Sequence, residues 1–183
     1  HRGFDFCGLF EPGEYPDPRW SLLGWKTLWR FQKKEISVEE KLKIHCLSYL
    51  LVDKILKEVY GIKDTQIVFD NDKPTLLSGE KHFSISHSGD LIALAFSDYN
   101  CGVDIERTTL REFTKISERM GFEATTLGEF YQEWTQYEAI YKLGEDSACA
   151  SYANYELEGY AMTAVSENEL EDYDVFCQED DEE

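Results

Sequence analysis

Residues 82–106 read HFSISHSGDLIALAFSDYNCGVDIE, and this stretch decides the fold. Three runs that are apolar, or that alternate between apolar and polar residues, are separated by two polar interruptions. The runs cover residues 82–86, 91–96 and 101–105. The interruptions at 88–90 and 98–100 contain Ser, Gly, Asp and Asn, which favour tight turns. The stretch therefore predicts three short antiparallel strands joined by tight turns.

A long helix is predicted on each side of these strands. Ser37 followed by Glu40 forms a capping box that starts the first helix. Apolar residues then recur at helical spacing over residues 42–59, and Gly61 is placed to end the helix. Residues 127–143 repeat this spacing downstream of the strands. Each helix therefore has an apolar side that can pack against a sheet.

Shorter elements complete the order along the chain. Strands are predicted at residues 66–69, 150–157 and 160–165, a polar turn at 70–74, and a helix at 110–120. The order predicts an α+β protein of two pseudo-symmetric halves, each a small, mainly antiparallel sheet packed on a long helix. We expect an N-terminal half over residues 1–98, a C-terminal half over 99–166, and an acidic tail over 167–183.

The net charge of −19 is concentrated toward the C-terminal end of the 183 residues. No Lys or Arg follows Lys142, whereas residues 145–183 hold 14 acidic residues. A run of this kind is typical of a solvated segment. Because contacts to phosphate backbones require clustered Lys and Arg, the charge argues against nucleic acid as a partner.

The cysteines and the hydropathy pattern bound the kind of protein. Five cysteines lie far apart in the chain, at positions 7, 46, 101, 149 and 177. This spacing fits neither a zinc site nor a disulfide framework, so we expect reduced thiols and a cytoplasmic location. No run is long and apolar enough to predict a membrane span. Two halves within one chain favour a monomer.

The first chemical feature is a pair of carboxylates in the third predicted strand. Asp104 and Glu106 are two residues apart, so both side chains project to one face while Val103 and Ile105 point into the core. Two adjacent carboxylates repel each other unless a cation lies between them. A hard cation such as Mg²⁺ binds carboxylates together with phosphate oxygens and water. The alternative is the solvated outer face of an amphipathic strand.

The second feature is the turn formed by Ser86, His87, Ser88 and Gly89. Its hydroxyls, imidazole and backbone N–H groups suit phosphate oxygens, although such residues also form ordinary turns. A hydrolase that uses Ser86 or Ser88 with His87 is a further alternative. Neighbouring side chains in such a turn point apart, however, whereas a nucleophile needs its base within hydrogen-bond reach.

The third feature lies on the second long helix, over residues 134–142. Glu138 and Lys142 are four residues apart, so they share one face of this helix. The alternative interpretation is a surface ion pair that contributes little to stability. Trp134 and Tyr141 beside them indicate a well-packed helix whose polar pair faces a cleft.

In this order, residues 83–89, 102–106 and 134–142 resemble the 4′-phosphopantetheinyl transferase superfamily, in its larger pseudo-dimeric, surfactin-synthetase-activating form. Weaker agreement covers roughly residues 35–166. The resemblance implies transfer of 4′-phosphopantetheine from coenzyme A to a serine of an acyl or peptidyl carrier protein, with release of 3′,5′-ADP. It also implies dependence on Mg²⁺, with Mn²⁺ as an alternative, and a place in fatty-acid, polyketide or nonribosomal peptide biosynthesis.

The resemblance further implies roles for individual residues. Asp104 and Glu106 would hold the metal against the coenzyme A diphosphate, while Glu138 would complete the metal site or take the proton of the carrier serine. Lys142 would stabilise the leaving diphosphate. The expected contacts to coenzyme A are made by Ser86, by His87 (also grouped with the catalytic residues), by Lys73, and by some of Arg30, Lys33, Lys34 and Lys43. Glu123 is the other glutamate that could serve as the third metal ligand.

One departure from the family pattern keeps other functions open. Tyr137 stands where the family usually has Lys, just before the Glu138–Ala139 pair. A first alternative is therefore a degenerate relative that binds coenzyme A or a carrier protein without turnover. A second alternative is a structural α+β module whose carboxylates have no affinity for metal.

Overall fold

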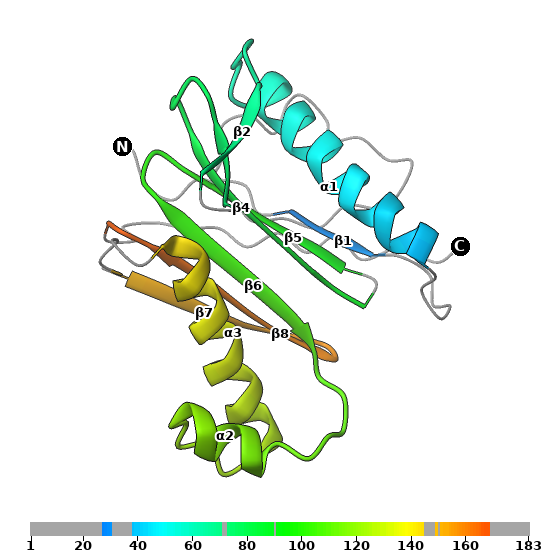
Figure 1. Ribbon diagram of the computed structural model, residues 1–183, viewed down its shortest axis with the longest axis vertical. Helices are drawn as coiled ribbons and strands as arrows, with labels where there is room; N and C mark the ends of the chain where they lie inside the picture. Colours follow the sequence, from blue (N-terminus) through cyan, green and yellow to red (C-terminus); the bar gives the residue numbers. More distant parts are fainter. Residues whose placement is uncertain are drawn as a thin grey trace.

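The computed structural model describes residues 27–30, 38–70, 73–89, 91–144, 149 and 151–168. The elements, in chain order, are β1 (Thr27–Arg30), α1 (Val38–Glu58), β2 (Ile67–Asp70), β3 (Lys73–Leu76), β4 (His82–Ser88), β5 (Leu91–Ser97), β6 (Cys101–Arg107), α2 (Thr114–Met120), α3 (Leu127–Leu143), β7 (Ser151–Leu157) and β8 (Tyr160–Ser166). Helices and small antiparallel sheets together confirm the predicted α+β class (Figure 1). The acidic tail beyond residue 168 lies outside the described residues.

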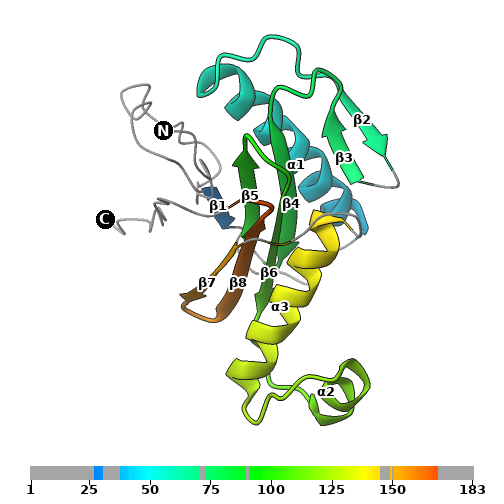
Figure 2. The ribbon, with the colours of Figure 1, turned by 90° about the vertical axis from the view of Figure 1, so that its left-hand side faces the viewer.

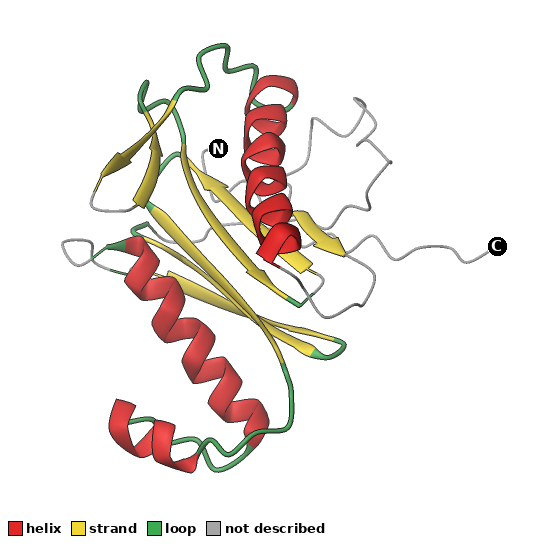
Figure 3. Cartoon of the chain, turned by 45° about the vertical axis from the view of Figure 1, so that its right-hand side comes forward, coloured by secondary structure: helices red, strands yellow, loops and turns green. Residues whose placement is uncertain are grey.

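The two halves of the protein have the same connectivity. The first contains the sheet β1-β5-β4 and helix α1, and the second contains the sheet β6-β8-β7 and helix α3. In each half the first strand (β1 or β6) comes before the long helix, and a hairpin (β4–β5 or β7–β8) comes after it. The second strand of the hairpin, β5 or β8, pairs antiparallel with the first strand of its half. Figure 3 shows the two long helices on separate sheets. The symmetry relation between the halves stays a prediction.

Strand β5 is buried on both faces, which explains why its sequence is a continuous apolar run. Ile92, Leu94 and Phe96 face α1 and pack with its buried residues, among them Val52 and Leu56. The alternate residues face the second sheet, where they pack with Val103, Ile105 and Met162; they are Leu91, Ala93 and Ala95. The core of the first half is therefore continuous with the layer between the two sheets.

Helix α3 starts and ends as local chemistry requires. The Thr126 side chain accepts from the Glu129 N–H, and the Glu129 carboxylate accepts from the Thr126 N–H, which completes a capping box. Gly144 follows the last helical residue, and its N–H donates to the Ile140 carbonyl. Ala139 and Leu143 are buried against Val165 of β8. The observed helix has the bounds that the sequence predicts.

The structure corrects three expectations. Residues 73 and 74 belong to strand β3, which pairs with β2, instead of to a turn over 70–74. A proline is tolerated there because β3 lies at the edge of a two-stranded sheet. Helix α2 begins only at Thr114, and Leu110 before it is 97% exposed, so the helix predicted over 110–120 is shorter. Strand β6 pairs with β8 and not with β5, so only β4 and β5 form a hairpin in this stretch.

The hairpin β2–β3 lies beside α1, at the opposite end of the molecule from α2 (Figure 2). Figure 2 also shows the C-terminal end of α3 directed toward this hairpin. None of the described helices combines the length and the apolarity that crossing a bilayer requires.

Candidate active site

Strand β6 carries the two carboxylates that the sequence singles out. Val103 and Ile105 are buried in the layer between the sheets, so Asp104 and Glu106 project from the other face of the strand. Asp104 is only 5% exposed, and Glu106 is partly buried. The alternative of a solvated outer face is therefore wrong for Asp104.

Gly102 allows the C-terminal end of α3 to lie directly on β6. A Cβ atom at Gly102 would lie 2.0 Å from the Ala139 carbonyl oxygen and 3.0 Å from the Leu143 nitrogen. No side chain fits this space, so only glycine permits the approach. The close contact places Glu138 and Lys142 beside the carboxylates of the strand.

Lys142 pairs with Asp104 across the two elements. Its Nζ lies 2.6 Å from Asp104 Oδ1 and donates to the Val103 carbonyl at 3.2 Å. The sequence suggests Glu138 as the partner at helical spacing, whereas the structure places this ion pair between α3 and β6. Since Asp104 is buried, the pair is a contact between elements and not a solvated pair on one helix.

The remaining carboxylates are held in an environment that disfavours their charge. Burial raises the pKa of Glu106, and the neighbouring charge of Asp104 raises it further. Burial and the charge of Asp104 also raise the pKa of Glu138, while Lys142 opposes this shift. Asp104 therefore lies close enough to each of the other two carboxylates for their charges to repel.

These residues fit a hard cation. Asp104 Oδ2 is buried and has no hydrogen-bond partner, which is an unusual state for a carboxylate oxygen. Among the residues that the structure describes, no three His, Cys, Asp or Glu side chains are grouped so that they could hold a metal ion by themselves. Mg²⁺ commonly uses one or two carboxylates together with substrate phosphates and water, so an incomplete protein cage suits it.

Strand β4 presents its serines and its histidine to opposite sides. The buried Ser86 hydroxyl donates to Asp104 Oδ1 at 2.7 Å, and the Ser88 hydroxyl donates to Glu106 Oε2 at 2.7 Å. His87 is exposed and lies on the side of Phe83, which packs toward α1. Its partial enclosure by protein lowers the pKa of His87, and the positive charges of Lys142 and His45 lower it further. A Ser–His nucleophile of the hydrolase type is not formed by these side chains.

Lys73 connects the β2–β3 hairpin to the end of α3. Its Nζ donates to the Leu143 carbonyl at 2.9 Å and to Asn100 Oδ1, and Asn100 Nδ2 donates to the same carbonyl at 2.6 Å. Burial lowers the pKa of Lys73. The amino group therefore bonds the backbone of Leu143, the residue that follows Lys142 at the end of α3. The predicted contact of Lys73 with coenzyme A stays a prediction.

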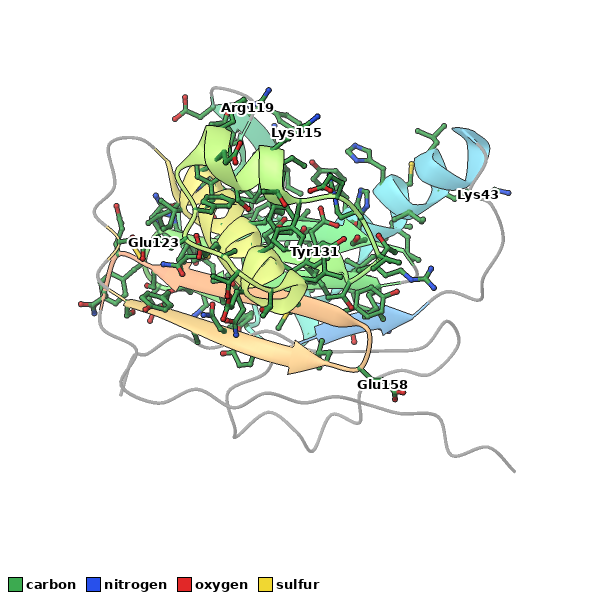
Figure 4. The ribbon with its side chains drawn as sticks, turned by 90° about the horizontal axis from the view of Figure 1, so that it is seen from below. Lys43, Lys115, Arg119, Glu123, Tyr131 and Glu158 are labelled. Atoms are coloured by element: carbon green, nitrogen blue, oxygen red, sulfur yellow. The ribbon has the colours of Figure 1, made fainter. Side chains whose placement is uncertain are left out.

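The structure does not bring every predicted residue to this group. Glu123 is exposed in the loop before α3, where its N–H donates to Glu133, so Glu138 is the glutamate beside Asp104. Lys43 is exposed on α1 and stands apart from α2 and its labelled side chains (Figure 4). Arg30 belongs to β1, but its side chain, Lys33 and Lys34 lie outside the described residues.

Sequence reasoning missed the roles of Ser88 and Asn100, which both bond groups of this site. A signal for Ser88 exists in the sequence, because Ser84, Ser86 and Ser88 alternate over the same length as Gly102, Asp104 and Glu106. No comparable pattern marks Asn100, whose partners are distant in the chain.

The chain is similar to a known protein over part of its length. Over 64 residues it is 38% identical to the 4′-phosphopantetheinyl transferase psf-1 of Bacillus pumilus, a match that covers 33% of this chain. The matched part spans 28% of the length of that protein. No model of a known protein family matches the chain. The resemblance inferred from the motifs is confirmed over this part of the sequence.

Proposed function

We propose that the protein transfers the 4′-phosphopantetheine group of coenzyme A to a serine of an acyl or peptidyl carrier protein, with Mg²⁺ or Mn²⁺. The observation that carries this proposal is the convergence of Asp104, Glu106, Glu138 and Lys142 from β6 and α3. Three carboxylates and one lysine suit a diphosphate with its metal ion. The similarity to a 4′-phosphopantetheinyl transferase supports the same reaction.

In this proposal the residues of β6 hold the metal. Asp104 would use the buried Oδ2 that has no protein partner, because its Oδ1 already accepts from Lys142 and Ser86. Glu106 would bind from the same face of the strand. The cation, when bound, neutralises the charge that develops on the diphosphate. Its presence would also relieve the repulsion between the carboxylates.

Glu138 is the base of the proposed transfer. The serine oxygen of the carrier forms a bond to the β-phosphorus of coenzyme A, and its proton passes to the Glu138 carboxylate. The bond from this phosphorus to the bridging oxygen breaks, and 3′,5′-ADP leaves with the electron pair. A raised pKa of Glu138 suits a base, because it brings the proton affinity of the carboxylate nearer to neutral pH. Lys142 would supply positive charge beside the leaving group.

The segment before and within α2 offers an approach for an acidic carrier. From the last residue of β6 to the end of α2 there are four basic residues against two acidic ones, in a chain of net charge −19; the basic residues are Arg107, Arg111, Lys115 and Arg119. Lys115 and Arg119 extend from α2 together, as Figure 4 shows. Leu110 in the same segment is 97% exposed. Positive charge around an apolar side chain suits a partner of opposite charge.

The first test is mass spectrometry of an apo carrier protein incubated with this protein, coenzyme A and Mg²⁺. We expect the carrier to gain one phosphopantetheine group, and EDTA to prevent the gain. Glu138→Gln should lose transfer while it keeps the fold and the affinity for coenzyme A, since it removes the base alone. Full transfer by Glu138→Gln would refute the role of Glu138 as the base.

A second function is favoured by one observation. Tyr137, which stands at the family's usual Lys position, is 45% exposed beside Glu138 and leaves this position without a cation. A relative that binds coenzyme A without turnover would have this feature. Measurable binding of coenzyme A together with no labelling of several carriers would support that function instead.

A further inference from the structure

Three serines of β4 face strand β6 at regular spacing. Ser84, Ser86 and Ser88 are two residues apart, so their side chains share one face of the strand. Ser84 and Ser86 are buried, and Ser88 is partly buried. Their opposite neighbours on the strand, Phe83 and Ile85, pack toward α1. The serines therefore lie between the two halves of the protein.

Each serine hydroxyl accepts a backbone N–H of β6. The Val103 N–H donates to Ser84 Oγ at 3.0 Å, and the Arg107 N–H donates to Ser88 Oγ at 3.0 Å. Between them, the Ile105 N–H donates to Ser86 Oγ at 3.3 Å. Strand β6 is the edge of its sheet, so every second N–H has no partner within that sheet. The serines supply these acceptors, which buried N–H groups require.

Two of the three hydroxyls also give their proton to a carboxylate. Ser86 donates to Asp104 Oδ1 and Ser88 donates to Glu106 Oε2, both at 2.7 Å. Asp104 directly precedes Ile105, whose N–H donates to the Ser86 hydroxyl. In the same way, Glu106 directly precedes Arg107, whose N–H donates to the Ser88 hydroxyl. At the Ser84 position the corresponding residue is Gly102, which has no side chain. The pattern is therefore the same at three positions, with a carboxylate at only two.

A hydroxyl has a single proton, so a serine that donates to a carboxylate cannot at the same time donate to a phosphate oxygen. We propose that Ser88 is a positioning residue that fixes the carboxylate of Glu106 for the metal ion, and that its hydroxyl is not a ligand of coenzyme A. This inference rests on the proposed function. Because the Ser88 hydroxyl bonds both the Arg107 N–H and the Glu106 carboxylate, it orients this carboxylate relative to the backbone of β6.

The test compares Ser88→Ala with Ser84→Ala. Both variants remove an acceptor from an N–H of β6, but only Ser88→Ala also removes a donor to a carboxylate. Mn²⁺ binding in the presence of coenzyme A is measured by the loss of the free Mn²⁺ signal in electron paramagnetic resonance. We expect Ser88→Ala to lower Mn²⁺ affinity by about 10- to 100-fold, as the loss of partners behind metal ligands commonly does. Ser84→Ala should lower the melting temperature and keep the affinity of the wild type.

Two additional measurements separate positioning from folding. Ser88→Thr retains the hydroxyl and should restore Mn²⁺ affinity. In the transfer assay, Ser88→Ala should need more Mg²⁺ to reach half of its maximal rate, with an unchanged KM for coenzyme A.

The outcomes distinguish this inference from the function on which it rests. Wild-type Mn²⁺ affinity in Ser88→Ala, or an equal loss in Ser84→Ala, would overturn the positioning role while transfer by the wild type stands. A raised KM for coenzyme A with unchanged metal affinity would instead make Ser88 a ligand of coenzyme A. Absence of Mn²⁺ binding and of transfer in the wild type would remove the proposed function and this inference together.

Discussion

The contact between α3 and β6 can be tested by the substitution Gly102→Ala. The added Cβ would lie 2.0 Å from the Ala139 carbonyl oxygen, whereas ordinary contact begins at 3.4 Å. Because the blocking atom belongs to the backbone of α3, no side chain can move aside. The end of the helix must therefore shift by about 1.4 Å or the strand must distort, which commonly costs about 1–3 kcal/mol.

This shift has a direct consequence for the site. A displacement of that size would lengthen the Lys142–Asp104 contact of 2.6 Å toward the limit of an ion pair, although the long lysine side chain can follow in part. Glu138 has a shorter side chain and moves with the helix. A misplacement of about 1 Å can cost about 100-fold in rate, so we expect a fall of this order in transfer.

The assays are the transfer reaction at low temperature, where the variant stays folded, and thermal unfolding. A chain of this length loses about 2–4 °C of melting temperature per kcal/mol. Gly128→Ala is the matched control, because Gly128 lies in α3 with open space around it. Alanine there should stabilise the protein by about 0.5–1 kcal/mol and leave transfer unchanged. Wild-type stability and rate in Gly102→Ala would refute the close approach of α3 to β6.

Three further predictions follow from charge and burial. Burial and the charge of Asp104 raise the pKa of Glu106, so the metal-free fold is more stable when this carboxyl is protonated. The gain in stability is complete below the unfolded pKa of 4.5, and it is lost as the pH rises through the raised pKa of the folded protein. Glu106→Gln should therefore gain melting temperature relative to the wild type as the pH rises from 4.5 to 7.5 in EDTA, and a constant difference would contradict this. Lys115→Glu combined with Arg119→Glu should raise the KM for the carrier and leave the KM for coenzyme A unchanged; equal carrier KM values would exclude this surface. Burial raises the pKa of Cys101 to about 12, so iodoacetamide at pH 8 should label the exposed Cys46 in the native protein and Cys101 only after unfolding, as peptide mass spectrometry can show.

Local sequence patterns were sufficient for most of the secondary structure. The alternation at 82–86, the apolar run at 91–96 and the helical spacing at 127–143 each identify an element, because side chains repeat every two residues in a strand and every 3.6 in a helix. The carboxylates Asp104 and Glu106 could be placed on one face of a strand for the same reason. The expected helix over 110–120 extended too far, since Leu110, which fits the helical pattern, is 97% exposed and the helix begins only at Thr114.

Partners that are distant in the chain could not be derived in this way. Lys142 is four residues from Glu138 in the sequence, but its partner is Asp104 on another element. Likewise, the turn at 98–100 predicts a hairpin of β5 and β6, whereas β6 joins β8. Ion pairs between elements and the pairing of strands depend on which elements pack together in the folded protein. A local sequence pattern does not contain this information.

The sequence by itself determined which elements form and which residues carry charge or hydroxyls on each face. Only the tertiary structure decided that the serines of β4 bond the edge of β6, and that Gly102 admits α3 close enough for Lys142 to reach Asp104. The physical reason is one of range: backbone periodicity acts over a few residues, whereas a carboxylate is buried or exposed according to all the elements packed around it.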